Sequence, residues 1–395
     1  MPKFAPPQSD KLTDRGTLDF TIAVLEHYFD LSADGTLCQT SDLWRVLVQA
    51  AARRSTIETV CTDLAEAPDS NTVRGYLKDQ LPVTTIRGLQ HDGNRALASQ
   101  LPAWLREAPR EIAIDLHDEP YYGQADPDDP DCWVCRGEAR AGTTRFYRCA
   151  TAYVLHRDVR FTLAVVFVHP DNDLRWIVQQ LCRRVKTLQI PVKCWFLDKG
   201  FCSIPLIRWF DAQCQSPALI AAPIRGKTGG LRALCTGRRS YRTTHTFRSA
   251  DYGELTVPVA VGRTFRRRRD GSRQAEGLVY VLIRLPHLPL RQVRKRYRRR
   301  FGIESSYRLL EQVRGRTTVR YPALRFLWMA IALILGNIWI ALHWRYLRRR
   351  GSGPRRVARW HFTLAQLAQF WRRVIEHIYG VISVIDPPDV KPAVL

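Results

Sequence analysis

The chain has 395 residues, 45% hydrophobic and 10% aromatic, so it holds enough apolar material for two or three packed domains and is not a disordered protein. Lys and Arg total 61 against 37 Asp and Glu, which gives a formal net charge of +24. So large a positive charge predicts attraction to a polyanion, with DNA or RNA ahead of an anionic membrane surface.

The N-terminal sequence and the cysteines bear on the cellular compartment. Residues 1–16 contain no apolar core of the kind that a signal peptide needs. The ten cysteines are scattered and do not form the dense framework of a small secreted domain. Cys132, Cys135 and Cys149 supply three ligands where structural zinc takes four, so zinc is not favoured. We expect a cytoplasmic protein, associated with the nucleoid if its partner is DNA.

The N-terminal third is predicted to be helical. Helical periodicity governs residues 17–50. A capping-box pattern follows at Ser55, with a glutamate three residues later, and another helix is expected to be capped near Ser70. Two short helices joined by a tight turn are typical of a helix-turn-helix, which would present Arg74 and Lys78 to DNA. An ordinary helical pair is the alternative.

From residue 110 the pattern changes from helical to extended. The expected elements are strands at 111–115, 143–156 and 159–169, a helix at 173–188, a strand at 192–198 and a helix at 203–213. This order is that of an RNase H-like core, in which acids ending the first and fourth strands meet on adjacent strands. Asp115 and Asp198 occupy those two places. Asp118 is the reserve candidate for the first.

Residues 225–290 are expected to form a β-rich insertion that folds as its own module. Glycines divide the segment, alternating apolar residues then predict strands, and a basic run occupies 263–269. The helical pattern resumes near Pro289. Seven of the ten residues at 291–300 are Lys or Arg, and this basic run leads directly to Glu304.

Glu304 is a carboxylate in basic surroundings. On a single helix, residues four or seven apart lie on nearly the same side. The residues that would share one face are Tyr297, Arg300, Glu304, Arg308 and Glu311. Either Glu304 is a catalytic carboxylate, or the segment is a solvated surface helix with ion pairs between successive turns.

The stretch 326–344 approaches the length of a membrane span. Its nineteen residues include no Asp, Glu, Lys or Arg. It is a single stretch, however, interrupted by Asn337 and ending near His343, and it follows the Glu304 segment directly. We favour a buried core helix, and a membrane span is the alternative.

A basic patch and an amphipathic helix at 363–379 end the chain. The predicted organisation is α/β. It consists of a helical, helix-turn-helix-like DNA-binding domain at 1–105, an RNase H-like core at 106–224, the β-rich insertion at 225–290, the second part of the core with the glutamate helix at 291–345, and a basic helical tail at 346–395.

Three carboxylates, those of Asp115, Asp198 and Glu304, could gather around two divalent cations. Carboxylate oxygens are hard ligands that suit Mg²⁺, with Mn²⁺ as a substitute. A pair of such ions activates the attacking oxygen and stabilises the leaving oxygen in phosphodiester displacement. The expected chemistry is therefore metal-dependent phosphoryl transfer on a nucleic acid.

At these residues the chain resembles the DDE transposases of bacterial insertion sequences, in the group with a Y-x2-R-x3-E motif and a later basic residue. Tyr297, Arg300 and Glu304 match that spacing, and the sequences at 112–123 and 196–201 are similar to the surroundings of the first two aspartates of the family. The resemblance covers roughly 110–345. It implies an RNase H-like fold, Mg²⁺ dependence, cleavage at the ends of the element, and transfer of the 3′-hydroxyl into target DNA by a homodimeric synaptic complex.

The resemblance also implies DNA contacts. The residues nominated for them, together with the two on the N-terminal helices, are Arg74, Lys78, Tyr297, Arg298, Arg299, Arg300, Arg308 and Arg314. The chain departs from the motif at Glu311, where the group has its closing basic residue, so that this role would fall on Arg308 or Arg314. No tryptophan occurs between Trp209 and Trp328, so the insertion lacks the tryptophan that stacks on a flipped base in some relatives. Its substitutes would be Tyr241, Phe247, Tyr252 or Phe265.

Two alternatives to catalysis remain. The chain could be a DNA-binding protein or repressor derived from a transposase, because affinity for DNA that falls with salt is expected of both. It could also be a basic protein tethered by its apolar helix, although we expect no membrane partner. Double-stranded DNA, as element ends and as target, is the expected partner.

Overall fold

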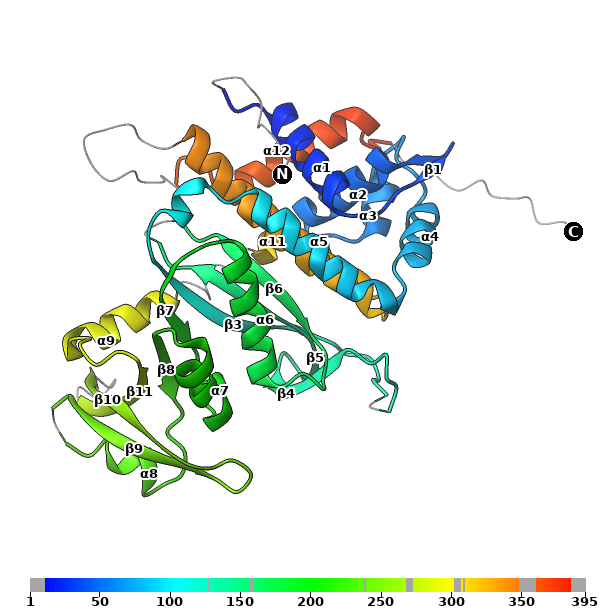
Figure 1. Cartoon of the computed structure of the whole chain (residues 1–395). Coiled ribbons are helices and arrows are strands. Elements are labelled where there is room, and N and C mark those ends of the chain that lie inside the picture. Colours follow the sequence, from blue (N-terminus) through cyan, green and yellow to red (C-terminus); the bar gives the residue numbers. More distant parts are fainter. Residues whose placement is uncertain are drawn as a thin grey trace, which may run out of the picture.

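The computed structural model of the chain describes residues 11–126, 128–156, 159–237, 239–267, 273–301, 307, 310–347 and 360–384. A helical layer lies at one end of the molecule, a large mixed sheet occupies its middle, and a β extension lies at the other end (Figure 1). The architecture is mixed α/β, as the sequence predicts.

The helical layer is built from both ends of the chain. Its helices are α1 (Asp14–Tyr28), α2 (Thr40–Arg53), α3 (Ile57–Asp63), α4 (Ser70–Gln80), α5 (Ile86–Ser99), α11 (Pro322–Tyr346) and α12 (Leu364–Tyr379). Helix α12 packs on α1 and α2, with Trp371 fully buried and the Tyr379 hydroxyl donating to Asp42 Oδ1 at 2.6 Å. The last helix, expected in a separate tail, thus belongs to the same layer as the first two.

The helical pair predicted around Ser55 and Ser70 is present as α3 and α4, with the second cap near Ser70 as expected and the first cap shifted by one residue. The Thr56 hydroxyl, rather than that of Ser55, accepts a hydrogen bond from the first turn of α3, at 3.1 Å. The Asp69 carboxylate caps α4 in the same way, at 2.8 Å. The Ser55 carbonyl instead accepts from the Arg316 N–H at 2.9 Å, which ties the start of α3 to the chain that leads into α11.

The sheet is built around three parallel strands. Its elements before the extension are β3 (Arg110–Pro120), β4 (Val134–Arg140), β5 (Thr143–Val154), β6 (Thr162–Val168), α6 (Leu174–Thr187), β7 (Val192–Leu197), α7 (Ile204–Trp209) and β8 (Ala218–Ala222). Strand β3 pairs in parallel with β7, which pairs in parallel with β8. On its other side β3 pairs antiparallel with β5, whose far edge is shared by β4 and β6. The predicted order of strands and helices is confirmed, with β4 as an unpredicted addition.

Two apolar layers cover the two faces of this sheet. Ile112 and Ile114 of β3 pack in the layer that includes α6 and α7. Ala113, between them, packs in the opposite layer with Phe196 and with α9 (Leu290–Tyr297). Side chains alternate between faces along a strand, so odd-numbered residues of β3 face α9.

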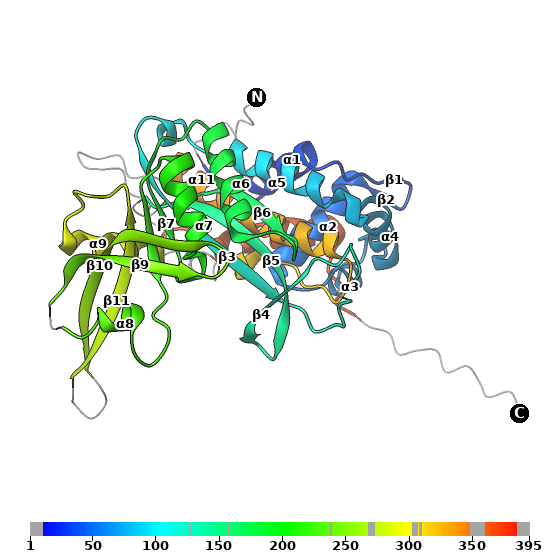
Figure 2. The ribbon, with the colours of Figure 1, turned by 60° about the horizontal axis from the view of Figure 1, so that its bottom comes forward.

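The β-rich segment continues the core sheet and is not a separate module. It contains α8 (Gly230–Ala233), β9 (Tyr241–Ser249), β10 (Gly253–Arg267) and β11 (Arg273–Ile283). Strand β11 pairs antiparallel with β8, and β10 and β9 follow outward. The expectation of an independent module was wrong, because β11 pairs with the edge of β8 and joins this segment to the core sheet. Figure 2 shows the continuous sheet with this extension at its end.

Side-chain amides cap the outer edge of β6. Asn94 of α5 accepts from the Val165 N–H at 2.9 Å and donates to the Val165 carbonyl at 2.8 Å. Gln90 accepts from the Phe167 N–H at 2.7 Å. Asn337 of α11 makes the equivalent pair with Thr162, accepting and donating at 2.9 Å each. An exposed strand edge invites pairing with other chains, and here the helices occupy it.

Helix α11 contains the long apolar stretch. It is the only helix in the described ranges long and apolar enough to cross a membrane, and the apolar part is wholly buried within the protein. It packs on α5, α12 and β6. Asn337, which interrupts the apolar run, is 1% exposed and serves the β6 edge. Burial on all sides favours the core-helix interpretation of this stretch.

Candidate active site

One face of β3 carries the candidate site. The face toward α9 presents Glu111, Asp115, His117 and Glu119. The chain around 296–325 contacts these side chains in sequence order. The contacts, from Glu111 to Glu119, come from Arg299, Arg300, Tyr307 and Arg325 in turn. Two acids and a histidine that the sequence analysis did not assign to the site, Glu111, Glu119 and His117, therefore lie on one strand face with Asp115.

Asp115 and Asp198 lie on neighbouring strands, as predicted. Ile114 of β3 is opposite Leu197 of β7, so the aspartates are the next residues on two parallel strands. Asp198 directly follows β7. Asp115 does not end its strand, because β3 continues to Pro120 through pairing with β5. The side chains are 16% and 36% exposed, respectively.

Asp118, the reserve candidate, projects to the opposite face of β3. Its carboxylate accepts two hydrogen bonds from the Arg148 guanidinium, at 2.6 and 3.1 Å. This bidentate pair is partly buried, with 14% of the Asp118 side chain exposed. Asp118 is therefore a structural ion-pair residue, and Asp115 faces Asp198.

A single guanidinium joins the two aspartates. Arg300 Nη1 lies 3.2 Å from Asp115 Oδ2, and Arg300 Nη2 lies 3.0 Å from Asp198 Oδ1. The Arg300 side chain is only 4% exposed. A solvated surface helix would leave this side chain in water. The burial of Arg300 therefore contradicts the alternative that the basic segment is only a solvated surface helix.

Tyr297 supports this arrangement from α9. Its hydroxyl donates to the Leu197 carbonyl at 3.1 Å and lies 3.4 Å from Asp198 Oδ1. The Arg300 guanidinium lies over its ring, 5.5 Å from the centroid. Burial, the first cause, raises the pKa of the Tyr297 phenol, so the hydroxyl is a donor at neutral pH. At 3% exposure, Tyr297 positions Asp198 and Arg300 rather than offering a surface for DNA.

The basic segment is not one continuous helix. Helix α9 ends at Tyr297 and a 3-10 turn follows over Arg298–Phe301, so the expected single face from residue 297 to residue 311 is wrong. Glu311 begins another 3-10 turn, Glu311–Val313. Glu304 and Arg308, expected to supply the third carboxylate and a DNA contact, lie outside the described residues.

Tyr307 covers the same face of β3 next to Asp115 and His117. Its hydroxyl lies 2.5 Å from Thr151 Oγ1 and donates to the Asp115 carbonyl at 3.4 Å. Its ring stacks on His117 with centroids 4.7 Å apart and planes 19° apart. Burial, followed by repulsion from Arg314, lowers the pKa of His117 from 6.5 to about 4. The imidazole is therefore neutral at physiological pH.

The pKa of His117 predicts a pH-dependent stability. Between about pH 6.5 and about pH 4 the unfolded chain protonates this imidazole and the folded protein does not, so the folded state loses stability as the pH falls through that window. One pKa unit corresponds to about 1.4 kcal/mol. His117→Phe keeps a ring against Tyr307 and removes the titration. We expect the drop in unfolding free energy from about pH 7 to about pH 4.5 to be smaller in this variant by about 2 kcal/mol.

Urea denaturation at the two pH values measures this difference. An unchanged drop in His117→Phe would mean that His117 titrates alike in both states.

The remaining acids on the β3 face are also paired. Glu111, 8% exposed, holds the Arg299 guanidinium at 3.0 Å. Glu119 lies 3.4 Å from the Arg325 guanidinium and 3.9 Å from that of Arg314, an expected DNA contact. The signal for this row of acids was present in the sequence as Glu111, Asp115 and Glu119, which are four residues apart and therefore lie on one face of a strand. It was missed because β3 was expected to end at Asp115.

A basic cavity opens beside the Glu111 end of this face. Its volume is about 700 Å³. It is lined by Glu111, Lys193, Arg291, Gln292, Lys295, Arg296 and Arg299. Glu111 pairs with Arg299 and lies 3.8 Å from Arg296, which leaves Lys193, Arg291 and Lys295 without a carboxylate within ion-pair distance in the described chain. The cavity therefore carries excess positive charge.

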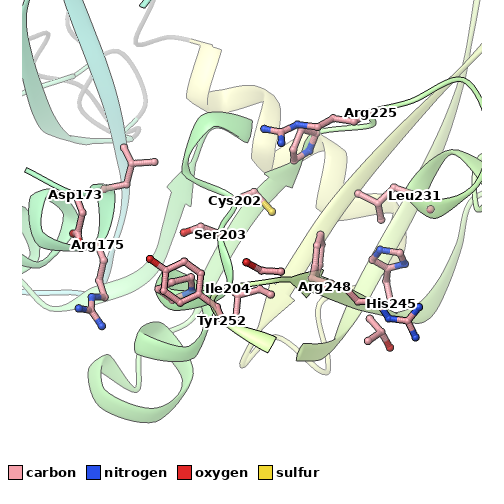
Figure 3. Close-up of a pocket in the computed structure, with 17 residues that line it drawn as sticks. Asp173, Arg175, Cys202, Ser203, Ile204, Arg225, Leu231, His245, Arg248 and Tyr252 are labelled. Carbon is pink, nitrogen blue, oxygen red and sulfur yellow. The ribbon is translucent and has the colours of Figure 1, made fainter. Parts of the chain in front are cut away.

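A second cavity, of about 620 Å³, lies between the core and the β extension (Figure 3). Arg175, Arg225 and Arg248 surround it, and Phe247 and Tyr252 line it from the extension. Figure 3 shows Arg175 at one end and Arg248 with His245 at the other. Two of the four aromatic substitutes named for base stacking are thus placed in one cation-lined cavity.

The other two aromatic substitutes lie elsewhere. Tyr241 donates its hydroxyl to the Leu234 carbonyl at 2.7 Å, and Phe265 is 55% exposed on β10. Neither lines the cavity of Figure 3.

The remaining residues proposed to contact DNA differ in whether their side chains are already paired within the protein. Arg74 on α4 is held by Glu58 at 2.6 Å and donates to the Ser70 carbonyl and to Asn71. Lys78, one turn further on, and Arg298, just after α9, are exposed. Lys78 and Arg298 are therefore available to an anion, whereas Arg74 would first have to leave its partners.

The described residues include no group of three His, Cys, Asp or Glu side chains arranged to hold a metal ion. Cys135 of the discounted zinc motif donates its thiol to the Val168 carbonyl at 3.5 Å, and Cys149 is buried in β5. The Asp115 and Asp198 carboxylates are the acids that the fold brings together at the nominated site.

Comparison with known proteins bears on the fold. No protein-family profile matches the sequence, and no curated protein matches it significantly. Among solved structures, the chain is similar to piggyBac transposase in a synaptic complex with hairpin DNA, with a TM-score of 0.50 and 12% identity. The match covers 92% of this chain and 76% of the other. The chain therefore has a transposase-like α/β fold.

Proposed function

We propose that this protein is a transposase that cleaves DNA at the ends of a mobile element and joins the freed 3′-hydroxyl to target DNA. The observation that carries the proposal is the meeting of Asp115 and Asp198 on adjacent parallel strands, where both contact Arg300. The transposase-like fold supports it. So does the net charge of +24, since both substrates are polyanions.

The strand order supports an RNase H-like core. That core was expected from the order strand, strand, strand, helix, strand, helix, and the corresponding elements are β3, β5, β6, α6, β7 and α7. Strand β3 is central, and β7 is parallel to it. The spacing of Tyr297, Arg300 and Glu304 supports the insertion-sequence group with the Y-x2-R-x3-E motif. Tyr297 and Arg300 both contact Asp198, as a motif that serves one site requires.

We assign the metal site to Asp115, Asp198 and Glu304. Two carboxylates on adjacent strands are a donor set that fits Mg²⁺ or Mn²⁺. The sequence neighbours of Glu304 on both sides, Arg300 and Tyr307, contact Asp115, which supports a place for Glu304 at the same site. Two ions held there would supply the charge that activates an attacking oxygen and stabilises a leaving one.

The protein side chains would orient the DNA. The exposed Arg298 and the cavity with Lys193, Arg291 and Lys295 lie close to the aspartates, because Glu111 is four residues, or about 13 Å, from Asp115 along β3. We assign phosphate contacts to these cations. We assign base stacking to Tyr252 and Phe247, because aromatic rings beside arginines can bind an unpaired nucleotide. The α3–α4 pair, with Lys78, would read the element ends as a helix-turn-helix, and two copies would pair the ends.

The phosphate contacts predict a salt dependence. If Lys193 and Lys295 each neutralise one phosphate, Lys193→Ala and Lys295→Ala should each weaken binding to all duplexes alike and lower the log–log salt slope by about 1. Lys186→Ala, on α6 over the opposite face of the sheet, is the control for one lost charge. Fluorescence anisotropy titrations over a range of salt measure the slopes. A slope that changes equally in all three variants would contradict a local phosphate site.

The direct test of the function is cleavage. Inverted repeats in the DNA flanking the gene would supply the substrate, and the purified protein should cut a duplex carrying such an end only when Mg²⁺ or Mn²⁺ is present. A protein that binds this end with high affinity, yet leaves it uncut with either metal, would instead be the non-catalytic DNA-binding derivative.

A further inference from the structure

We propose that Arg300 is a built-in counter-cation that competes with divalent metal for Asp115 and Asp198, so that a DNA phosphate opens the metal site by drawing the guanidinium away. The inference rests on the proposed function, because it takes these aspartates as metal ligands. It adds that metal binding and DNA binding are coupled through one side chain.

The contact geometry places the guanidinium and a divalent ion in competition for the same two carboxylates. Both terminal nitrogens of Arg300 are committed, one to Asp115 Oδ2 at 3.2 Å and one to Asp198 Oδ1 at 3.0 Å. The Asp115 and Asp198 carboxylates would also be the groups that hold a divalent ion. The ion and the guanidinium would then carry like charges in contact within a site where Arg300 is 4% exposed and solvent screens little.

The surroundings of Arg300 favour the bridged position. The Tyr297 ring supports the guanidinium, and the Tyr297 hydroxyl is fixed to the Leu197 carbonyl at 3.1 Å, so the face on which Arg300 lies is rigid. The two aspartates gain a positive partner that removes part of their mutual repulsion. A divalent ion must therefore displace two ion pairs, of which the one to Asp198 is a charge-assisted hydrogen bond, and this lowers its affinity.

A phosphate is the anion suited to hold Arg300 once it leaves. A guanidinium binds phosphate and carboxylate oxygens with the same two-pronged geometry. Arg298 and Arg299 precede Arg300 in the same turn and are exposed, so an incoming DNA backbone meets positive charge there first. When DNA is bound, Arg300 would contact a phosphate instead of the two carboxylates, and the aspartates would then be free to bind metal. By linkage, DNA should raise metal affinity and metal should raise DNA affinity by the same factor.

Binding of Mn²⁺ to the full-length protein, measured by electron paramagnetic resonance and calorimetry, tests this without reference to cleavage. The parent should bind Mn²⁺ weakly alone and at least tenfold more tightly with a duplex carrying the element end. Arg300→Gln removes the charge and should bind Mn²⁺ at least tenfold more tightly than the parent without DNA. In this variant DNA should no longer increase the affinity. Asp198→Asn should lose most Mn²⁺ binding in both conditions.

Arg300→Lys gives a second reading if the glutamine variant fails to fold. A lysine keeps the charge but cannot bridge two carboxylates with two prongs, so Mn²⁺ affinity without DNA should rise by a smaller factor. Folded Arg300 variants that bind Mn²⁺ no more tightly than the parent would overturn the competition. Absence of Mn²⁺ binding in every folded variant, with and without DNA, would instead remove the metal site and the proposed function with it.

Discussion

Asp198→Asn should lower the rate of Mg²⁺-dependent cleavage of end DNA by about 10³-fold or more. The change keeps the shape of the side chain and removes the charge that would hold a cation and that now pairs with Arg300. Asp115→Asn and Glu304→Gln should give the same result. A double change should be little worse than either single one, because residues that act as one unit are strongly non-additive. Single-turnover cleavage of labelled end duplex measures the rate.

Asp118→Asn is the matched control. Asp118 lies three residues beyond Asp115 on the same strand, faces away from the site, and pairs with Arg148. Its loss should reduce stability through the broken ion pair and leave cleavage by the folded protein near the parental rate. End binding should survive in all the variants. Cleavage by Glu304→Gln at close to the parental rate would remove Glu304 from the three-carboxylate site.

Asn337→Leu should lower the unfolding free energy by several kcal/mol, although it makes an apolar helix more apolar. Leucine has nearly the shape of asparagine, but it leaves the N–H and the carbonyl of Thr162 without partners at a buried strand edge. Each such group costs about 1–3 kcal/mol. Urea denaturation measures the loss. Against a total stability of about 5–15 kcal/mol this would be a severe defect.

Ile338→Val is the control for a small change in α11. Ile338 is fully buried, and loss of one methyl group there should cost about 1 kcal/mol. If α11 spanned a membrane, Asn337→Leu would instead favour insertion, since an amide in lipid is unfavourable. A more stable protein, or one recovered with the lipid fraction after a high-salt wash, would support the membrane interpretation.

The succession of core elements could be predicted from the sequence because it depends on local periodicity. Alternating apolar residues and amphipathic spacing were enough to find β5, β6, α6, β7 and the aspartate after it. The meeting of Asp115 and Asp198 followed from the RNase H-like order of elements, in which the acids that end the first and fourth strands lie on adjacent strands. These inferences used local periodicity and the strand order of one fold class.

The features that the sequence did not predict depend on partners distant along the chain. Strand β3 continues past Asp115 because β5 pairs with it as far as Pro120, 26 residues before the partner Phe146. The basic residues before Glu304 were taken for DNA contacts, and Arg300 is instead buried against two acids more than a hundred residues earlier. Positive charge in a sequence does not reveal whether its partner is a phosphate or a carboxylate of the same chain.

The return of α12 to the N-terminal layer has a consequence for the order in which this protein is made. Trp371 and Tyr379 complete the packing of α1 and α2, so the first helices to leave the ribosome lack their apolar cover until the last helix is synthesised. At about 5–20 residues per second, the interval between α2 and α12 lasts roughly 15–60 s. A chain that stops before α12 would expose the apolar faces of α1 and α2 to chaperones and proteases, so that only chains extending through α12 carry a finished helical layer.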